Sequence, residues 1–209
     1  MAAKIKTKRE IEIKLRVSNL RAVLRHIRKM GAVPRGRTLE QNTLFDTPDS
    51  SFWRHDRLLR LRTQTPAPGN GSRGGLRTTI LTAKAPPPTR SRSRKNLPYK
   101  ERLETELAVG KRGLQPQVLQ DLGLRAGFKY EKYRTSFRLG GLHLDLDETP
   151  IGTFLELEGS PSAIRRTALR LGYSAKDHIR ATCWDLYAAD CRRLKRTPRN
   201  MVFNSQKSR

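Results

Sequence analysis

The sequence predicts an α+β protein in which a closed eight-stranded antiparallel β-barrel carries amphipathic helices on its outside. Several segments alternate charged and apolar residues strictly, as a strand with two unlike faces does. Most are joined by connections of hairpin length, which favours an antiparallel meander that closes on itself. The predicted helices each have one apolar stripe to bury. If the charged strand faces line the interior, the apolar faces point outward and the helices can cover them.

The chain is strongly basic, with 44 Lys and Arg against 19 Asp and Glu in 209 residues and a formal net charge of +25. Such a charge implies a polyanionic partner: a nucleic acid, a polyphosphate or a phosphorylated small molecule. Two cysteines, Cys183 and Cys191, are too few for a disulfide framework, so a reducing, cytoplasmic setting is expected. No apolar run approaches the length of a membrane span, and we expect a soluble protein without a membrane partner.

One domain, residues 8–194, is expected between a basic N-terminal extension, 1–7, and a basic tail, 195–209. The tail has no periodicity and is expected to be disordered. Two segments within the domain, about 65–75 and 85–98, are rich in proline, glycine or arginine and are expected to be flexible loops.

The first strand is predicted at 10–15, where Glu10, Glu12 and Lys14 share one face and isoleucine and leucine share the other. A helix from about 19 to 30 follows, because its apolar residues have helical spacing, a capping residue precedes them and a glycine follows them. Its apolar stripe is expected to cover the outside of the barrel.

The next four strands follow from the same alternation and from the turns between them. They are predicted at 41–47, 58–62, 76–84 and 99–109. A Thr-Pro-Asp turn ends the first of them, and segments rich in proline and glycine bound the third. Their charged faces carry Arg60, Arg62, Lys84, Arg102, Glu104 and Glu106.

The rest of the chain combines three strands with three helices. The strands are predicted at 130–138, 142–147 and 154–158, and the helices at 114–122, 161–171 and 181–194. Gly-Gly at 140–141 and Pro-Ile-Gly at 150–152 join the strands as hairpins, and Ser160 caps the helix that follows. The charged strand faces carry Lys132, Arg134, Asp145, Asp147, Glu156 and Glu158.

Together these faces would place eight carboxylates and seven cations inside one barrel. Burying so many charges without a ligand would cost several kcal/mol for each unpaired ion. Clustered carboxylates hold Mg²⁺ or Mn²⁺, and clustered arginine and lysine clamp phosphoryl oxygens. A polyanion with its divalent cations is therefore the expected ligand.

The charged motifs, in their order along the chain, resemble the CYTH domain of the triphosphate tunnel metalloenzymes. Glu10-x-Glu12-x-Lys14 opens the set and Glu156-x-Glu158 closes it. Between them lie Arg60 with Arg62, Lys84, Arg102-x-Glu104-x-Glu106, Lys132-x-Arg134 and Asp147. The resemblance extends from about residue 8 to 190 and implies an eight-stranded tunnel that binds a linear triphosphate.

The resemblance also implies a role for each residue. The ligands of Mg²⁺ or Mn²⁺ would be Glu10, Glu12, Glu156 and Glu158. The phosphate-binding residues would be Lys14, Arg60, Arg62, Lys84, Arg102, Lys132 and Arg134. The catalytic residues, which assist metal binding or orient water, would be Glu104, Glu106 and Asp147. His143 is interpreted as a surface residue that faces away from Asp145, and Trp53 and Trp184 as packing residues that could also stack on a base.

The resemblance implies hydrolysis of inorganic tripolyphosphate or of an organic or nucleoside triphosphate. The alternative is a class IV adenylyl cyclase, which converts ATP to cyclic AMP and pyrophosphate. Such members often have a histidine shortly before the first glutamate, where this chain has Lys8 and Arg9, and a Ser-Tyr pair where it has Thr182-Cys183.

A second alternative is a non-catalytic polyphosphate- or RNA-binding module that uses the basic run at 90–95 and the tail. Monomer and homodimer are both open.

Overall fold

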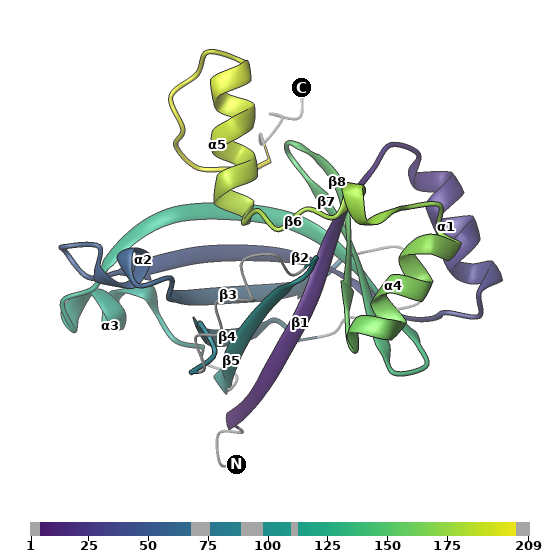
Figure 1. Cartoon of the computed structure of the whole chain (residues 1–209). Helices are drawn as coiled ribbons and strands as arrows, with labels where there is room; N and C mark the ends of the chain where they lie inside the picture. The colour runs from purple at the N-terminus through teal and green to yellow at the C-terminus, as the bar shows by residue number, and fades with distance from the viewer. Residues whose placement is uncertain (1–4, 68–75, 89–97, 110–112, 204–209) are drawn as a thin grey trace, which may run out of the picture.

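The strands among the described residues close into one antiparallel barrel (Figure 1). The computed structural model describes residues 5–67, 76–88, 98–109 and 113–203. The strands are β1 (Ile5–Val17), β2 (Val33–Asp46), β3 (Leu58–Pro66), β4 (Thr78–Ala85), β5 (Lys100–Val109), β6 (Arg125–Leu139), β7 (Leu142–Thr149) and β8 (Gly152–Glu158). The predicted closed eight-stranded barrel is confirmed.

The order of strands around the barrel is β1-β5-β4-β3-β2-β6-β7-β8. Strands β2 to β5 and β6 to β8 follow chain order, but β1 lies between β5 and β8, and β2 pairs with β6. Both departures occur where a helix interrupts the connection: α1 (Leu20–Lys29) follows β1 and α3 (Pro116–Asp121) follows β5. A hairpin loop can join only neighbouring strands, whereas a longer connection can cross to a distant one. The simple meander is therefore wrong at these two points.

The apolar strand faces point outward, and α1 and α4 (Pro161–Arg170) cover those of β1, β7 and β8 (Figure 1). Val23 and Ile27 of α1 and Ile164 and Ala168 of α4 belong to one core cluster with the strands. The strand residues of this cluster that are at most 1% exposed are Ile13, Leu15, Leu144, Leu146, Leu155 and Leu157. Burial of each such side chain contributes about 1.5–3 kcal/mol. Because the apolar strand faces are buried beneath the helices, the charged faces point into the barrel.

The remaining helical segments are α2 (Ser51–Arg54), the 3₁₀ turn η2 (Ala175–Asp177) and α5 (Cys183–Arg193). Thr182 and Asp185 form a reciprocal capping box at the start of α5, with Thr182 Oγ1 accepting from the Asp185 N–H at 3.1 Å. Within the described part of the chain, no helix is long and apolar enough to cross a membrane.

Part of the basic tail is ordered, contrary to expectation. Met201 is 1% exposed, and its N–H donates to the Lys129 carbonyl at 2.9 Å while its own carbonyl accepts from the Glu131 N–H at 2.8 Å. Strand β7 pairs with only the second half of β6, so the first half has an open edge that the segment around Met201 covers. Residues 204–209, and most of the two expected flexible loops (68–75 and 89–97), lie outside the described residues.

Candidate active site

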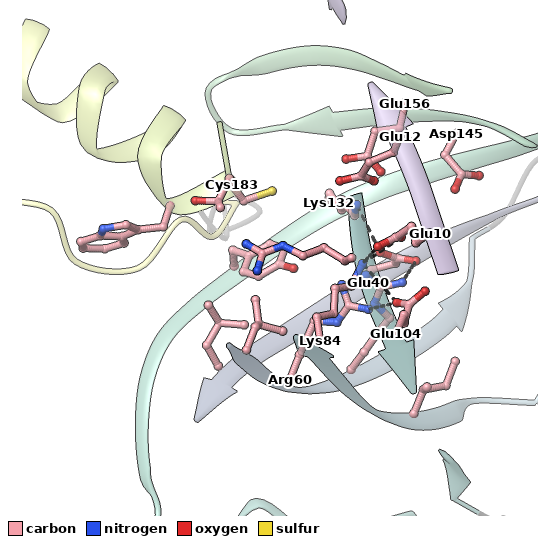
Figure 2. A pocket seen from close by; sticks show the side chains of 18 of the residues that line it. Glu10, Glu12, Glu40, Arg60, Lys84, Glu104, Lys132, Asp145, Glu156 and Cys183 are labelled. Carbon is pink, nitrogen blue, oxygen red and sulfur yellow. Dashed lines mark hydrogen bonds and ion pairs between the residues drawn. The ribbon is translucent and has the colours of Figure 1, made fainter. Parts of the chain in front are cut away.

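A cavity of about 1590 Å³ occupies the barrel's interior, and every strand contributes to its lining (Figure 2). Of the fourteen residues to which the resemblance gives a role, all but Asp147 line this cavity. Asp147 is itself only 2% exposed and is hydrogen-bonded to two lining residues, Lys132 and Arg134. Strand alternation thus brings the predicted set into one space.

The first group of ion pairs joins β1, β4 and β5. Lys84 Nζ lies 2.6 Å from Glu10 Oε2 and 3.1 Å from Glu104 Oε1. Burial raises the pKa of Glu10 to about 7, against the attraction of Lys84. The like charges of Glu12 and Glu104 add to this rise. Glu10 can therefore hold or release a proton at neutral pH.

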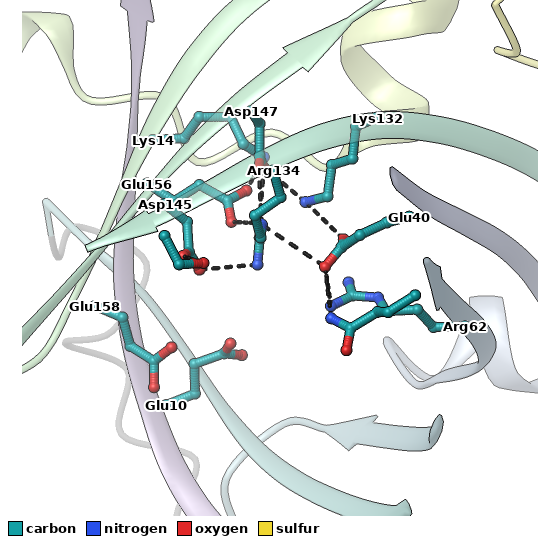
Figure 3. Close-up of polar contacts among 12 residues, drawn as sticks. Glu10, Lys14, Glu40, Arg62, Lys132, Arg134, Asp145, Asp147, Glu156 and Glu158 are labelled. Atoms are coloured by element: carbon teal, nitrogen blue, oxygen red, sulfur yellow. Dashed lines mark hydrogen bonds and ion pairs between the residues drawn. The ribbon is translucent and has the colours of Figure 1, made fainter. Parts of the chain in front are cut away.

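The second group joins β6, β7 and β8 around Arg134 (Figure 3). The Arg134 guanidinium lies 2.7 Å from Asp147 Oδ1, 2.9 Å from Asp145 Oδ2 and 2.5 Å from Glu156 Oε2. Lys132 Nζ lies 2.6 Å from Asp147 Oδ2. Burial raises the pKa of Asp147 despite these two cations. Burial also opposes the ionisation of Glu156, but its cations, Lys132 foremost, outweigh it and hold the pKa of Glu156 well below its usual range.

Glu40 on β2 links Arg62 of β3 to Lys132 of β6, and the sequence prediction misses it. It is fully buried, its Oε1 accepts from Arg62 Nη1 at 3.0 Å, and its Oε2 lies 3.6 Å from Lys132 Nζ (Figure 3). Burial opposes the charge of Glu40, but Arg62 and the neighbouring cations outweigh it and lower the pKa. The sequence prediction starts this strand at Gln41, eight residues after its observed start at Val33, so the alternation of Glu40 with Asn42 goes unused.

Lys8 and Lys100 also line the cavity without having been assigned a role. Each stands two residues before a predicted inward residue, Glu10 or Arg102, and so shares its strand face. Lys8 Nζ lies 2.6 Å from Glu158 Oε1, and burial lowers the pKa of Lys100. Extending the first strand by one alternation toward its N-terminus identifies Lys8, whereas Lys100 already lies on the charged face of the strand predicted at 99–109.

Arg102 lines the cavity, as expected of it, and donates to Asp56 with an Nη2 to Oδ1 distance of 2.5 Å. His143, expected at the surface, lines the cavity. It stands two residues from Asp145 on the same strand, so the two side chains share a face, and the expectation rested on a wrong assignment of parity. Burial and the nearby Arg138 lower the pKa of His143.

The end of the cavity near α2 and α5 has aromatic and apolar side chains beside its charged ones. Leu44, Trp53 and Trp184 are among its lining residues. The ring centroid of Trp184 lies 5.0 Å from that of Phe128, so Trp184 packs as predicted. Trp53, in contrast, is 56% exposed and has a free ring surface. This end offers a setting for an organic group that the charged interior does not.

The carboxylates of β1 and β8 have the chemistry of a divalent-metal site. Glu12 stands across from Glu158 in the strand register, with Glu156 as its diagonal neighbour, and Figure 2 shows Glu12 and Glu156 inside the cavity. Glu12 forms no ion pair with another described residue, unlike Glu10 and Glu156. The negative charge and oxygen donors of these carboxylates fit a hard cation such as Mg²⁺ or Mn²⁺. Within the described residues, no three side chains are already gathered as metal ligands.

The protein is a closed antiparallel barrel with arginine, lysine and carboxylate side chains lining a central cavity. The chain belongs to the CYTH domain family, whose model matches residues 8–182. No curated protein matches the sequence.

Solved structures that share the fold include the following three. A Vibrio parahaemolyticus protein proposed to be an adenylate cyclase is 19% identical, with a TM-score of 0.66 over 87% of this chain and 98% of that one. The PH1819 protein of Pyrococcus horikoshii OT3 is also 19% identical, with a TM-score of 0.66 over 88% and 98%. The HpAC1 protein of Hippeastrum, proposed to be an adenylyl cyclase and described as having a dominant triphosphatase activity, is 18% identical, with a TM-score of 0.53 over 90% and 97%.

Proposed function

We propose that the protein is a divalent-metal-dependent triphosphatase that hydrolyses a linear triphosphate inside the barrel. The observation that carries this proposal is the set of buried and half-buried cations on four strands, β1, β3, β4 and β6, that line one cavity together with carboxylates. The cations are Lys14, Arg60, Arg62, Lys84, Lys132 and Arg134.

Exchange of ion-pair partners explains how the site can take up so charged a ligand. Each buried cation now neutralises a carboxylate, as Lys84 does Glu10 and Lys14 does Glu156. A triphosphate would pair with the cations, and divalent metal would pair with the released carboxylates. Every buried charge keeps a partner in both states, which avoids the cost of an unpaired buried ion.

The cavity residues would have two different roles, metal binding and phosphate binding. Glu10, Glu12, Glu156 and Glu158 would hold the metal, which when bound supplies charge neutralisation at the phosphoryl oxygens. Arg60, Arg62 and Lys132 would bind and align the phosphates.

The three carboxylates proposed as catalytic have different settings. Glu104 is buried, and its cations, Lys84 foremost, outweigh burial and lower its pKa, so it stays anionic and positions them. Asp147 orients Lys132 and Arg134. The Glu106 side chain is 33% exposed and accepts from Thr82, so it has room to orient a water or take its proton.

Adenylyl cyclase activity is the second candidate, because the aromatic end of the cavity could hold a nucleobase. Trp53 offers an exposed ring there, and the Vibrio parahaemolyticus and Hippeastrum proteins are both named as proposed cyclases. Hydrolysis remains our first choice because Lys8, Arg9 and Thr182-Cys183 depart from the cyclase pattern. The proposed phosphate-binding cations would serve either reaction.

A substrate panel tests the proposal. Tripolyphosphate, ATP, thiamine triphosphate and 5′-triphosphorylated RNA are incubated with Mg²⁺ or Mn²⁺, and both phosphate and cyclic AMP are measured. We expect phosphate release from at least one triphosphate, its loss on chelation of the metal, and no cyclic AMP. Cyclic AMP without phosphate release would identify a cyclase, and neither product would leave only a binding module.

A further inference from the structure

The outer faces of α1 and α4 both carry exposed cations outside the tunnel. Their exposed cations, which we call the helical basic face, are Arg21, Arg25, Arg28, Lys29, Arg165, Arg166 and Arg170. Residues 13–39 and 159–176, which contain the two helices, include no aspartate or glutamate. The charge of this face is therefore not balanced by its own helices.

Among the described residues, the cations of the helical basic face have no carboxylate beside them, whereas some exposed cations elsewhere do, as Arg54 does with Asp49. Within the part of the chain that the structure describes, none of the seven cations of the helical basic face makes an ion pair. Their guanidinium and ammonium groups are free to bind an external anion.

The spacing of these cations works against helix stability. Arg21 and Arg25, Arg25 and Lys29, and Arg166 and Arg170 each stand four residues apart, where like charges repel on a helix surface. A surface shaped only by stability and solubility would intersperse acidic residues. The pattern therefore favours a binding role.

The two helices are held on one support. Val23 and Ile27 of α1 and Ile164 and Ala168 of α4 are buried in the same core cluster, and Figure 1 shows the helices together over that part of the barrel. Because the apolar stripes are fixed inward, the charged stripes are fixed outward as a preformed surface.

We propose that the helical basic face binds the phosphate backbone of a nucleic acid. Six of its seven cations are arginines, whose planar guanidinium matches phosphate oxygens in bidentate fashion. An anionic membrane is less well matched, because a membrane-surface helix needs an exposed apolar face to insert. On α1 and α4 only Leu169 is a large apolar side chain that is exposed. This site is separate from the tunnel and does not rest on its proposed activity.

Binding of a fluorescent single-stranded oligouridylate, followed by anisotropy over a range of salt, tests the inference. Three variants with equal loss of charge are compared. They are Arg21→Gln/Arg25→Gln/Arg28→Gln on α1, Arg165→Gln/Arg166→Gln/Arg170→Gln on α4, and the control Arg192→Gln/Lys195→Gln/Arg196→Gln at the end of α5. At about 0.15 M salt we expect each helical variant to bind roughly tenfold more weakly, with a salt slope smaller by about two, and the control to change less than about twofold.

The outcomes separate this site from the tunnel and from non-specific attraction. Phosphate release from tripolyphosphate should be unchanged in both helical variants. Equal weakening in all three variants would show attraction by net charge alone and would overturn the proposal, as would no oligouridylate binding by the unmodified protein. Binding to phosphatidylserine vesicles that is lost in the helical variants, without oligouridylate binding, would assign the face to membranes instead.

Discussion

Glu12→Gln is expected to lower metal-dependent phosphate release from tripolyphosphate by about a thousandfold or more, with the barrel still folded. Glu12 lines the cavity and stands across β1 and β8 from Glu158. It forms no ion pair with a described residue, so its charge is available to a divalent cation. Glutamine keeps the shape of the side chain but removes that charge. Phosphate release with Mn²⁺, together with the circular dichroism spectrum and melting temperature, measures the effect.

Glu148→Gln is the matched control for this variant. Glu148 lies on the same barrel but outside the cavity, where it pairs with Arg37. Its replacement removes one carboxylate and should leave activity within about threefold. Unchanged activity in Glu12→Gln would exclude Glu12 from the metal site and favour a binding module.

Arg134→Met is expected to reduce both stability and activity. The guanidinium is surrounded by Asp145, Asp147 and Glu156, and its removal leaves these buried carboxylates with fewer cations. Loss of one partner from such a buried network costs about 3–5 kcal/mol. Denaturant unfolding without metal measures this loss. Arg125→Met, at the exposed start of the same strand, is the control and should change stability by less than about 1 kcal/mol.

The loss of stability in Arg134→Met is expected to depend on pH in a defined direction. The lowered pKa of Glu156 means that its pairing stabilises the fold above the pKa of the unfolded chain, and that this stability is lost as pH falls toward the folded pKa. Without Arg134, part of that stabilisation is absent, and Asp147, whose pKa is already raised, would be protonated more readily. The stability difference between the two proteins should therefore be largest at neutral pH and shrink in acid. A difference that grows in acid would contradict the assignment of these ion pairs.

Much of the barrel could be predicted because its signal is local. Alternation along Glu10, Glu12 and Lys14 needs no knowledge of neighbouring strands, and the outward Ile13 and Leu15 explain why helices cover the outside. Strand order could not be predicted in the same way. The place of β1 between β5 and β8 depends on how two helix-bearing connections cross the barrel, and no residue spacing encodes that choice.

The candidate site shows the same limit. The sequence identifies the residues that alternate strictly along a strand. It does not identify their ion-pair partners, because these depend on pairing between strands that are far apart in sequence. Arg134 meets Asp147 and Glu156 because β6, β7 and β8 are neighbours in a fixed register. Glu40 was missed because its strand was started too late, and the ordered segment around Met201 was missed because the open edge of β6 is visible only in three dimensions.

A crystal structure of the protein with Mn²⁺ and a non-hydrolysable triphosphate tests the central claim most directly. We predict the triphosphate inside the barrel against Arg60, Arg62 and Lys132, and anomalous scattering from Mn²⁺ beside Glu12. A triphosphate bound only outside the barrel, or Mn²⁺ bound away from Glu12, would contradict the account.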